Sequence, residues 1–115
     1  LIAHIEKHRI DGVIFLSGDR HYSELHYEAR DGHPPLLEFT SSPLQQNQKV
    51  APLKNRPNTF RLWGLNGNSY GLVTVDIPEP GQGTVRLEVR TEANTVPVVG
   101  NTRCSSAWQL SDLRY

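Results

Sequence analysis

An aspartate and a histidine stand two positions apart directly after an apolar run near the start of the 115-residue chain. The run covers residues 13–16, and the polar pair is Asp19 and His21 in Gly18-Asp19-Arg20-His21. A carboxylate oxygen and a neutral imidazole nitrogen are both metal ligands, and a glycine permits the tight turn that would aim them at one point. The alternative is that Asp19 caps the following segment and His21 is an ordinary polar loop residue. The spacing alone leaves both interpretations open.

The segment before this pair has the pattern of a helix followed by a strand. Residues 1–10 place Leu1, Ile2 and Ile5 on one side, which predicts the last turns of an amphipathic helix that ends at Asp11-Gly12. The continuous apolar run at 13–16 predicts a strand buried on both faces of a mixed or parallel sheet. Ligands of such sheets collect beyond the carboxyl ends of the parallel strands, where Asp19 and His21 would lie.

The rest of the chain is expected to form mainly antiparallel strands. Alternation predicts an antiparallel pair at 25–30 and 36–39, with breaks at Asp31-Gly32 and Pro34-Pro35. Residues 44–67 predict a long surface loop, and the clearest hairpin joins 69–77 to 85–90. The tail has enough apolar residues to dock on this core. We therefore expect an α/β to α+β fold, mainly antiparallel after one buried strand.

Composition limits the classes of function. The length suits one small domain, and 12 basic against 12 acidic residues predict no nucleic-acid-binding surface. No apolar run approaches the ~20 residues of a membrane-spanning helix. The single Cys104 excludes an internal disulfide. Because the chain contains no Met and begins with Leu1, we expect it to be a piece of a longer polypeptide.

Three segments resemble the C-terminal part of the PhoD-like alkaline phosphatases (alkaline phosphatase D), relatives of the calcineurin-like metallophosphoesterases. They are the apolar strand ending in Gly-Asp-x-His at 18–21, the strand ending in a Thr/Ser cluster at 38–43, and the Asn-x-Tyr-Gly strand start at 68–71. They occur in the family's order, and the resemblance covers most of residues 10–91. It implies that residues 1–115 are the C-terminal part of a metallophosphatase domain, half of a β-sandwich flanked by helices.

The resemblance also implies that Asp19 and His21 are catalytic ligands of a binuclear or multinuclear metal centre. The wider group has Gly-His-x-His here, so Asp19 replaces a histidine. That favours iron, calcium or manganese over an all-imidazole zinc site, with the metal's identity left open. Such metals polarise phosphoryl oxygens and lower the pKa of a bound water. The implied activity is hydrolysis of a phosphate ester, as a phosphomonoesterase or phosphodiesterase.

The residues beside the Gly-Asp-x-His motif are weaker candidates for a functional role. Arg20 could clamp a substrate phosphate, or simply face solvent. Tyr22 and Glu24 match the family's His-Tyr-x-Glu pattern, in which Glu24 would orient a metal ligand, although packing at a strand start explains both equally well. The cluster Thr40, Ser41 and Ser42 could donate hydrogen bonds to the site or satisfy the turn before Pro43.

The other histidines are expected to be bystanders. His26 would lie on the exposed face of a strand, and His33 stands beside Pro34-Pro35. His4 and His8 have the i, i+4 spacing of a helical metal site, but no third ligand is evident, so an ordinary helix surface is favoured.

The family's upstream motifs, which supply most of the metal ligands, do not occur in this sequence. Two ligands cannot complete a coordination shell, so the chain alone should bind metal weakly and need the N-terminal part of its own domain for activity. Without that part it should expose apolar sheet faces and aggregate. Relatives are often periplasmic or secreted. Two other functions remain open, a noncatalytic β-rich accessory or binding module and a different metal-dependent hydrolase.

Overall fold

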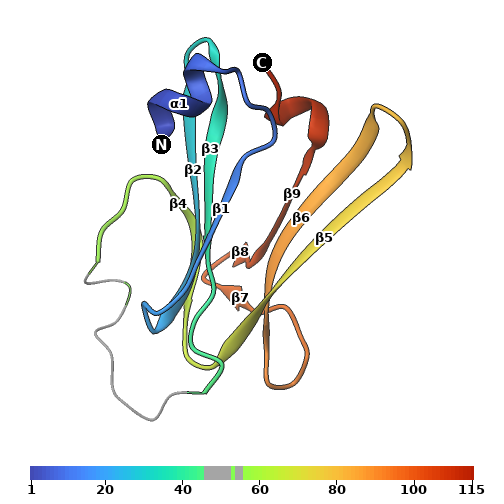
Figure 1. Ribbon diagram of the computed structural model, residues 1–115. Coiled ribbons are helices and arrows are strands. Elements are labelled where there is room, and N and C mark those ends of the chain that lie inside the picture. The colour runs from blue at the N-terminus through green and yellow to red at the C-terminus, as the bar shows by residue number, and fades with distance from the viewer. Residues whose placement is uncertain (46–52, 54–55) are drawn as a thin grey trace.

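The chain forms two β-sheets that face each other, as the computed structural model in Figure 1 shows. The structure describes residues 1–45, 53 and 56–115. The elements in chain order are α1 (Ile2–Lys7), β1 (Ile14–Ser17), β2 (Tyr22–Arg30), β3 (His33–Thr40), β4 (Arg61–Asn66), β5 (Ser69–Glu79), β6 (Gln82–Thr91), β7 (Val98–Val99), β8 (Thr102–Arg103), β9 (Ser105–Gln109) and η2 (Leu110–Leu113).

The first sheet has four strands in the order β1-β3-β2-β4. β1 runs parallel to β3, whereas β2 is antiparallel to both β3 and β4. The register aligns Leu16 with Phe39, Phe39 with Leu25, and Leu25 with Trp63, so these four side chains form one row across the inner face. Because side chains alternate along a strand, the residues next to them in sequence form a row on the outer face.

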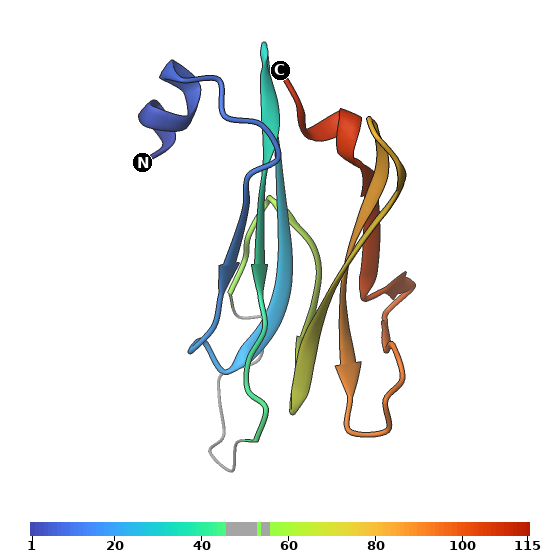
Figure 2. The ribbon, with the colours of Figure 1, turned by 45° about the vertical axis from the view of Figure 1, so that its right-hand side comes forward.

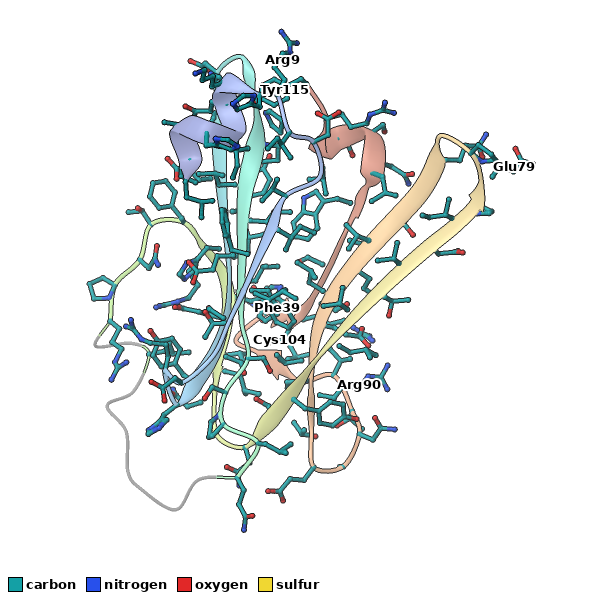
Figure 3. All side chains as sticks on the ribbon, viewed as in Figure 1. Arg9, Phe39, Glu79, Arg90, Cys104 and Tyr115 are labelled. Carbon is teal, nitrogen blue, oxygen red and sulfur yellow. The ribbon has the colours of Figure 1, made fainter. Side chains whose placement is uncertain are left out.

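The second sheet, β5-β6-β9, is antiparallel throughout and lies against the inner face of the first, as Figure 2 shows. Val85, Leu87 and Val89 of β6 pack into the core with Leu25 and its neighbours. The ring of Trp108 stacks on Tyr27 at 6.3 Å between centroids, and the Trp63 indole donates a hydrogen bond to Ser106 Oγ at 2.9 Å. Figure 3 labels Phe39 and Cys104 in this interior, and burial raises the pKa of the Cys104 thiol.

Several expectations from the sequence are confirmed. The N-terminal helix, the antiparallel pair β2–β3 and the hairpin β5–β6 are all present, and the fold is β-rich and mainly antiparallel. The tail docks as expected, through Trp108, Leu110 and Leu113. None of the described helices is long and apolar enough to cross a bilayer.

The expectation that the first strand is buried on both faces is wrong. β1 is the edge strand of its sheet, and Leu16, which belongs to the inner row, is 64% exposed. A continuous apolar run indicates that a strand is suited to burial. How far the strand is actually covered depends on its position in the sheet and on what packs against it.

Pro34-Pro35 does not break the second strand, because both prolines lie inside β3. They fall where the pairing of β2 with β3 shifts register, between Leu36 opposite Glu28 and His33 opposite Arg30. A proline is tolerated at such an irregularity because no ladder hydrogen bond requires its missing N–H. The turn is made by Asp31 and Gly32 alone.

The predicted loop at 44–67 contains an unpredicted strand. β4 pairs with β2, and its Trp63 side chain is buried in the core. The sequence RLWGLN has no clear alternation of apolar and polar residues, so the strand is defined by its partner rather than by its own pattern. Residues 46–52 and 54–55 of the predicted loop lie outside the described part of the chain.

The edge strand β5 carries exposed apolar residues on the face that points toward the core. Val73 is aligned with Leu87 and Val75 with Val85, yet Val75 is 56% exposed and Val73 and Ile77 are exposed as well. In Figure 1 the β5–β6 hairpin extends away from β1. The expected exposed apolar sheet face is therefore present along β5.

Candidate functional site

The turn 18–21 follows the carboxyl end of β1, at the end of the sheet where the parallel pair β1–β3 also ends. Asp19 and His21 both adopt the left-handed backbone conformation, with φ of 62° and 60°. Aspartate and histidine enter this region more easily than most residues, and the two turns of the backbone bring the chain from β1 into β2. Asp19 is exposed and His21 is half-buried.

The Thr/Ser cluster at the end of β3 holds this turn in place. The backbone N–H of Ser41 donates to the carbonyl of Ser17 at 3.0 Å, and that of His21 donates to Ser42 Oγ at 3.3 Å. Thr40 Oγ1 and Ser17 Oγ share a hydrogen bond of 2.7 Å. The cluster thus satisfies the local backbone and, through the same bonds, ties the candidate metal-binding turn to the adjacent strand.

Ser23 extends this support to the second sheet. Its hydroxyl is fully buried, and it exchanges hydrogen bonds with the backbone of Ser42 and with Ser69 Oγ, the latter at 2.9 Å. The start of β2, the end of β3 and the start of β5 are therefore joined below the turn.

A polar cavity of about 480 Å³ opens beside the turn, on the outer face of the four-stranded sheet. Register brings the side chains of Ser17, Thr40 and Glu24 into one row there and pairs His26 with Glu38 in the next. The cavity is lined by Ser17, Gly18, Arg20, Tyr22, Glu24, His26, Glu38, Thr40, Arg56, Pro57, Asn58 and Arg61. Arg20 therefore lines this polar cavity, whereas Asp19 and His21 stand in the turn outside its lining.

Glu24 lines the polar cavity and is buried, with an exposed fraction of 4%. One carboxylate oxygen accepts a hydrogen bond from Arg61 Nε at 2.5 Å, and the other lies 2.9 Å from His26 Nε2. Asn58 Nδ2 lies 2.9 Å from the same ring nitrogen of His26. The expected role of Glu24, to orient a metal ligand, stays a prediction, because the contacts of its carboxylate are with Arg61 and His26.

His26 takes part in this polar network, although its sequence position suggested only an exposed strand face. Its Nδ1 lies 3.7 Å from Glu38 Oε2, and Ser17 Oγ donates to Glu38 Oε1 at 2.9 Å. The period-2 alternation placed His26 on the outer face of its strand, but it could not show that His26 lies opposite Glu38 on the neighbouring strand.

The Tyr22 ring is contacted by two guanidinium groups at the same cavity. The guanidinium carbon of Arg20 lies 5.6 Å from the centroid of the Tyr22 ring, and that of Arg56 lies 4.9 Å from it. Tyr22 is 3% exposed, so the strand-start packing considered for this residue is what the structure shows. Arg56 was not among the residues singled out by the sequence, since nothing local connects it with the turn at 18–21.

The remaining histidines lie away from the polar cavity. His4 and His8 contact each other on α1, with ring centroids 4.3 Å apart, and His33 lies 3.3 Å from the Tyr115 hydroxyl. Figure 3 labels Tyr115 beside Arg9 near the chain termini, where the guanidinium of Arg9 lies over its ring at 5.0 Å. Among residues 1–45, 53 and 56–115, no three His, Cys, Asp or Glu side chains come together as a metal site.

In comparisons with known proteins, no protein-family model, curated protein or solved structure matches the chain.

Proposed function

We propose that this chain is the C-terminal part of a metal-dependent phosphoric ester hydrolase of the PhoD-like type, in which Asp19 and His21 are metal ligands. The observation that carries the proposal is the position of these two donors, in one short turn at the carboxyl end of a parallel strand and next to a polar cavity. That end of a parallel strand is where α/β proteins gather their ligands.

The chemistry of the two donors fits a metal as part of a larger ligand set. A carboxylate oxygen and an imidazole nitrogen suit iron, manganese or zinc, and the carboxylate suits calcium as well. Two donors do not complete a coordination shell, so a binuclear or multinuclear centre would draw its other ligands from polypeptide outside this sequence. When bound, the metals would polarise the phosphoryl group and supply an activated water.

The chain's own residues would position the ester and keep the turn rigid. The hydroxyls of Ser17 and Ser42, together with the backbone N–H of Ser41, fix the backbone that carries the two ligands. Arg20, between them in sequence and on the cavity wall, would offer its guanidinium to a phosphate group of the substrate that enters the cavity.

The exposed inner face of β5 supports the proposal that this chain packs against the rest of its domain. Leu16 on β1 and Val73 and Val75 on β5 belong to core-facing rows of two edge strands and are exposed. In soluble proteins the apolar inner face of an edge strand is usually covered by another element of the protein or by a partner.

The test is hydrolysis of p-nitrophenyl phosphate and bis(p-nitrophenyl) phosphate by the longer protein that contains this chain, with manganese, iron or calcium added. Asp19→Ala and His21→Ala should each lower kcat/KM by more than about 100-fold, because removing groups that merely orient metal ligands already costs 10–100-fold. A chelator should abolish the activity of the unchanged protein, and metal should restore it.

Matched controls separate loss of a ligand from general damage. Asp31→Ala and His8→Ala remove an exposed aspartate and an exposed histidine elsewhere, and both should leave hydrolysis unchanged. Hydrolysis that survives in the Asp19 and His21 variants would refute the proposal. A hydrolase whose ligands lie elsewhere would then be the better account, whereas an unchanged protein without any hydrolysis would favour the noncatalytic binding module.

A further inference from the structure

Two arginines from distant parts of the sequence both contact one buried ring and both line the polar cavity. Arg20 comes from the turn after β1, and Arg56 comes from the segment before β4. Their guanidinium carbons lie 5.6 Å and 4.9 Å from the centroid of the Tyr22 ring. Stacking uses the flat face of a guanidinium, so its N–H groups, which lie in the plane, remain able to bind an anion.

The position of Arg56 depends on the buried Glu24–Arg61 pair. Arg61 Nε is bound to Glu24, and Nη2 of the same guanidinium donates to the carbonyl oxygen of Arg56 at 2.7 Å. The N–H of Arg56 donates to the carbonyl oxygen of Leu53 at 2.9 Å. The backbone that carries Arg56 is therefore anchored to the sheet rather than free in a surface segment.

The lining of the polar cavity carries one positive charge in excess, since Arg20, Arg56 and Arg61 stand against Glu24 and Glu38. The carboxylates that line it, Glu24 and Glu38, are already engaged by Arg61, His26 and Ser17. Within the part of the chain that the structure describes, neither Arg20 nor Arg56 forms an ion pair with a carboxylate. A cavity with two such cations and about 480 Å³ of space suits an anionic group.

The arrangement also separates this anion site from the proposed metal ligands. Arg20 and Arg56 line the polar cavity, whereas Asp19 and His21 do not, although all but Arg56 belong to one turn. A phosphate held by metal at Asp19 and His21 would therefore lie beside the cavity, and another part of the same substrate would occupy it.

We propose that Arg20 and Arg56 bind a second phosphate group of the substrate, adjacent to the one that is cleaved. This inference rests on the proposed function and narrows its substrate class to phosphoric esters with two phosphate groups, such as a nucleoside 3′,5′-bisphosphate, in which water cleaves one ester to an alcohol and phosphate while the other phosphate stays in the cavity. Arg56 is then a residue that sets specificity, and the Glu24–Arg61 pair positions it.

The direct test measures the binding of inorganic pyrophosphate to the longer protein by calorimetry, with metal removed by a chelator. Arg56→Gln should weaken binding about tenfold, the usual worth of one charge-assisted hydrogen bond, and Arg56→Lys should weaken it less. Arg103→Gln, which removes an exposed arginine on β8, is the matched control and should bind as the unchanged protein does. Equal affinity of the Arg56→Gln and unchanged proteins would overturn the proposal.

Kinetics provide the second arm. With metal present, Arg56→Gln should raise KM for a nucleoside 3′,5′-bisphosphate about tenfold and leave KM for p-nitrophenyl phosphate, which has one phosphate, unchanged. An equal change for both substrates would overturn the second-phosphate assignment. If Asp19→Ala retains hydrolysis while Arg56→Gln still loses pyrophosphate affinity, the proposed catalytic function fails and the anion subsite stands.

Discussion

Glu24 and Arg61 form a buried ion pair that joins β2 to β4 on the outer face of the four-stranded sheet, with Glu24 Oε2 2.5 Å from Arg61 Nε. The Arg61 guanidinium also donates to the carbonyl oxygens of Leu53 and Arg56. One side chain thus satisfies a buried carboxylate and fixes the segment that enters β4. The pair is a structural support for the polar cavity whether or not the cavity is catalytic.

Removal of Arg61 should destabilise the chain more than removal of an exposed arginine. Arg61→Ala leaves the Glu24 carboxylate buried without its main cation, and breaking such a pair costs roughly 3 kcal/mol. Urea unfolding would measure it, with Arg103→Ala as the control expected to change stability by less than about 0.5 kcal/mol. The double variant Glu24→Gln/Arg61→Met should recover much of the loss, since it removes both charges together. No recovery would mean that the backbone contacts of Arg61 matter more than its charge.

Glu88 should make stability depend on pH in the acidic range. Burial raises the pKa of its carboxyl, but hydrogen bonds from Arg90 and Ser105 and the charges of Arg90 and Arg86 outweigh burial, so the pKa lies below its ordinary value of 4.5. A lowered folded-state pKa means that the ionised form stabilises the fold above about pH 4.5, and that this contribution is lost as pH falls from there through the lowered value.

The measurement is urea unfolding from pH 7 down to pH 3 for the unchanged chain and for Glu88→Gln. The variant should be less stable at pH 7 and should lose less stability on acidification, so the two curves converge at low pH. Parallel curves would show that Glu88 contributes nothing to the acid sensitivity. Glu92→Gln, at an exposed position just beyond β6, serves as the matched control.

The inner row of the four-stranded sheet should carry much of the packing energy. Phe39 is 3% exposed and its ring packs edge-to-face on Trp63 at 5.9 Å. Phe39→Ala should cost about 3–5 kcal/mol, because it leaves a cavity between the sheets. Phe60→Ala removes the same ring at a position that is 47% exposed and should cost under about 1 kcal/mol. Similar losses from both, measured by denaturant unfolding, would contradict the assigned core.

The exposed face of β5 should drive self-association of the 115-residue chain. Val75→Lys places a charge on the apolar inner face of an edge strand, a common protection against edge pairing, and should slow aggregation measured by light scattering. Asn101→Lys adds the same charge at an exposed turn and controls for net charge. If both substitutions slow aggregation equally, the effect belongs to charge and not to β5.

Local patterns predicted the elements whose structure is set by nearby residues. The alternation on either side of Gly81 predicted the hairpin β5–β6, and the alternation around Asp31-Gly32 predicted the pair β2–β3. Both are antiparallel pairs joined by short turns, so the chain segment itself brings the partners together. The strand β4 was missed because its main determinant is pairing with β2, and the sequence between residues 61 and 66 lacks alternation.

The candidate site, too, was predicted from the sequence only in part. The sequence by itself determined that Asp19 and His21 follow an apolar strand with a glycine before them, and that His26 lies on the exposed face of the next strand. Only the tertiary structure decided that Arg61 neutralises Glu24, that Arg56 and Arg20 both contact Tyr22, and that β1 is an edge strand. The physical reason is that alternation and turn chemistry act between neighbours along the chain. The partner of a buried charge is chosen by strand order and register, which depend on how the whole core packs.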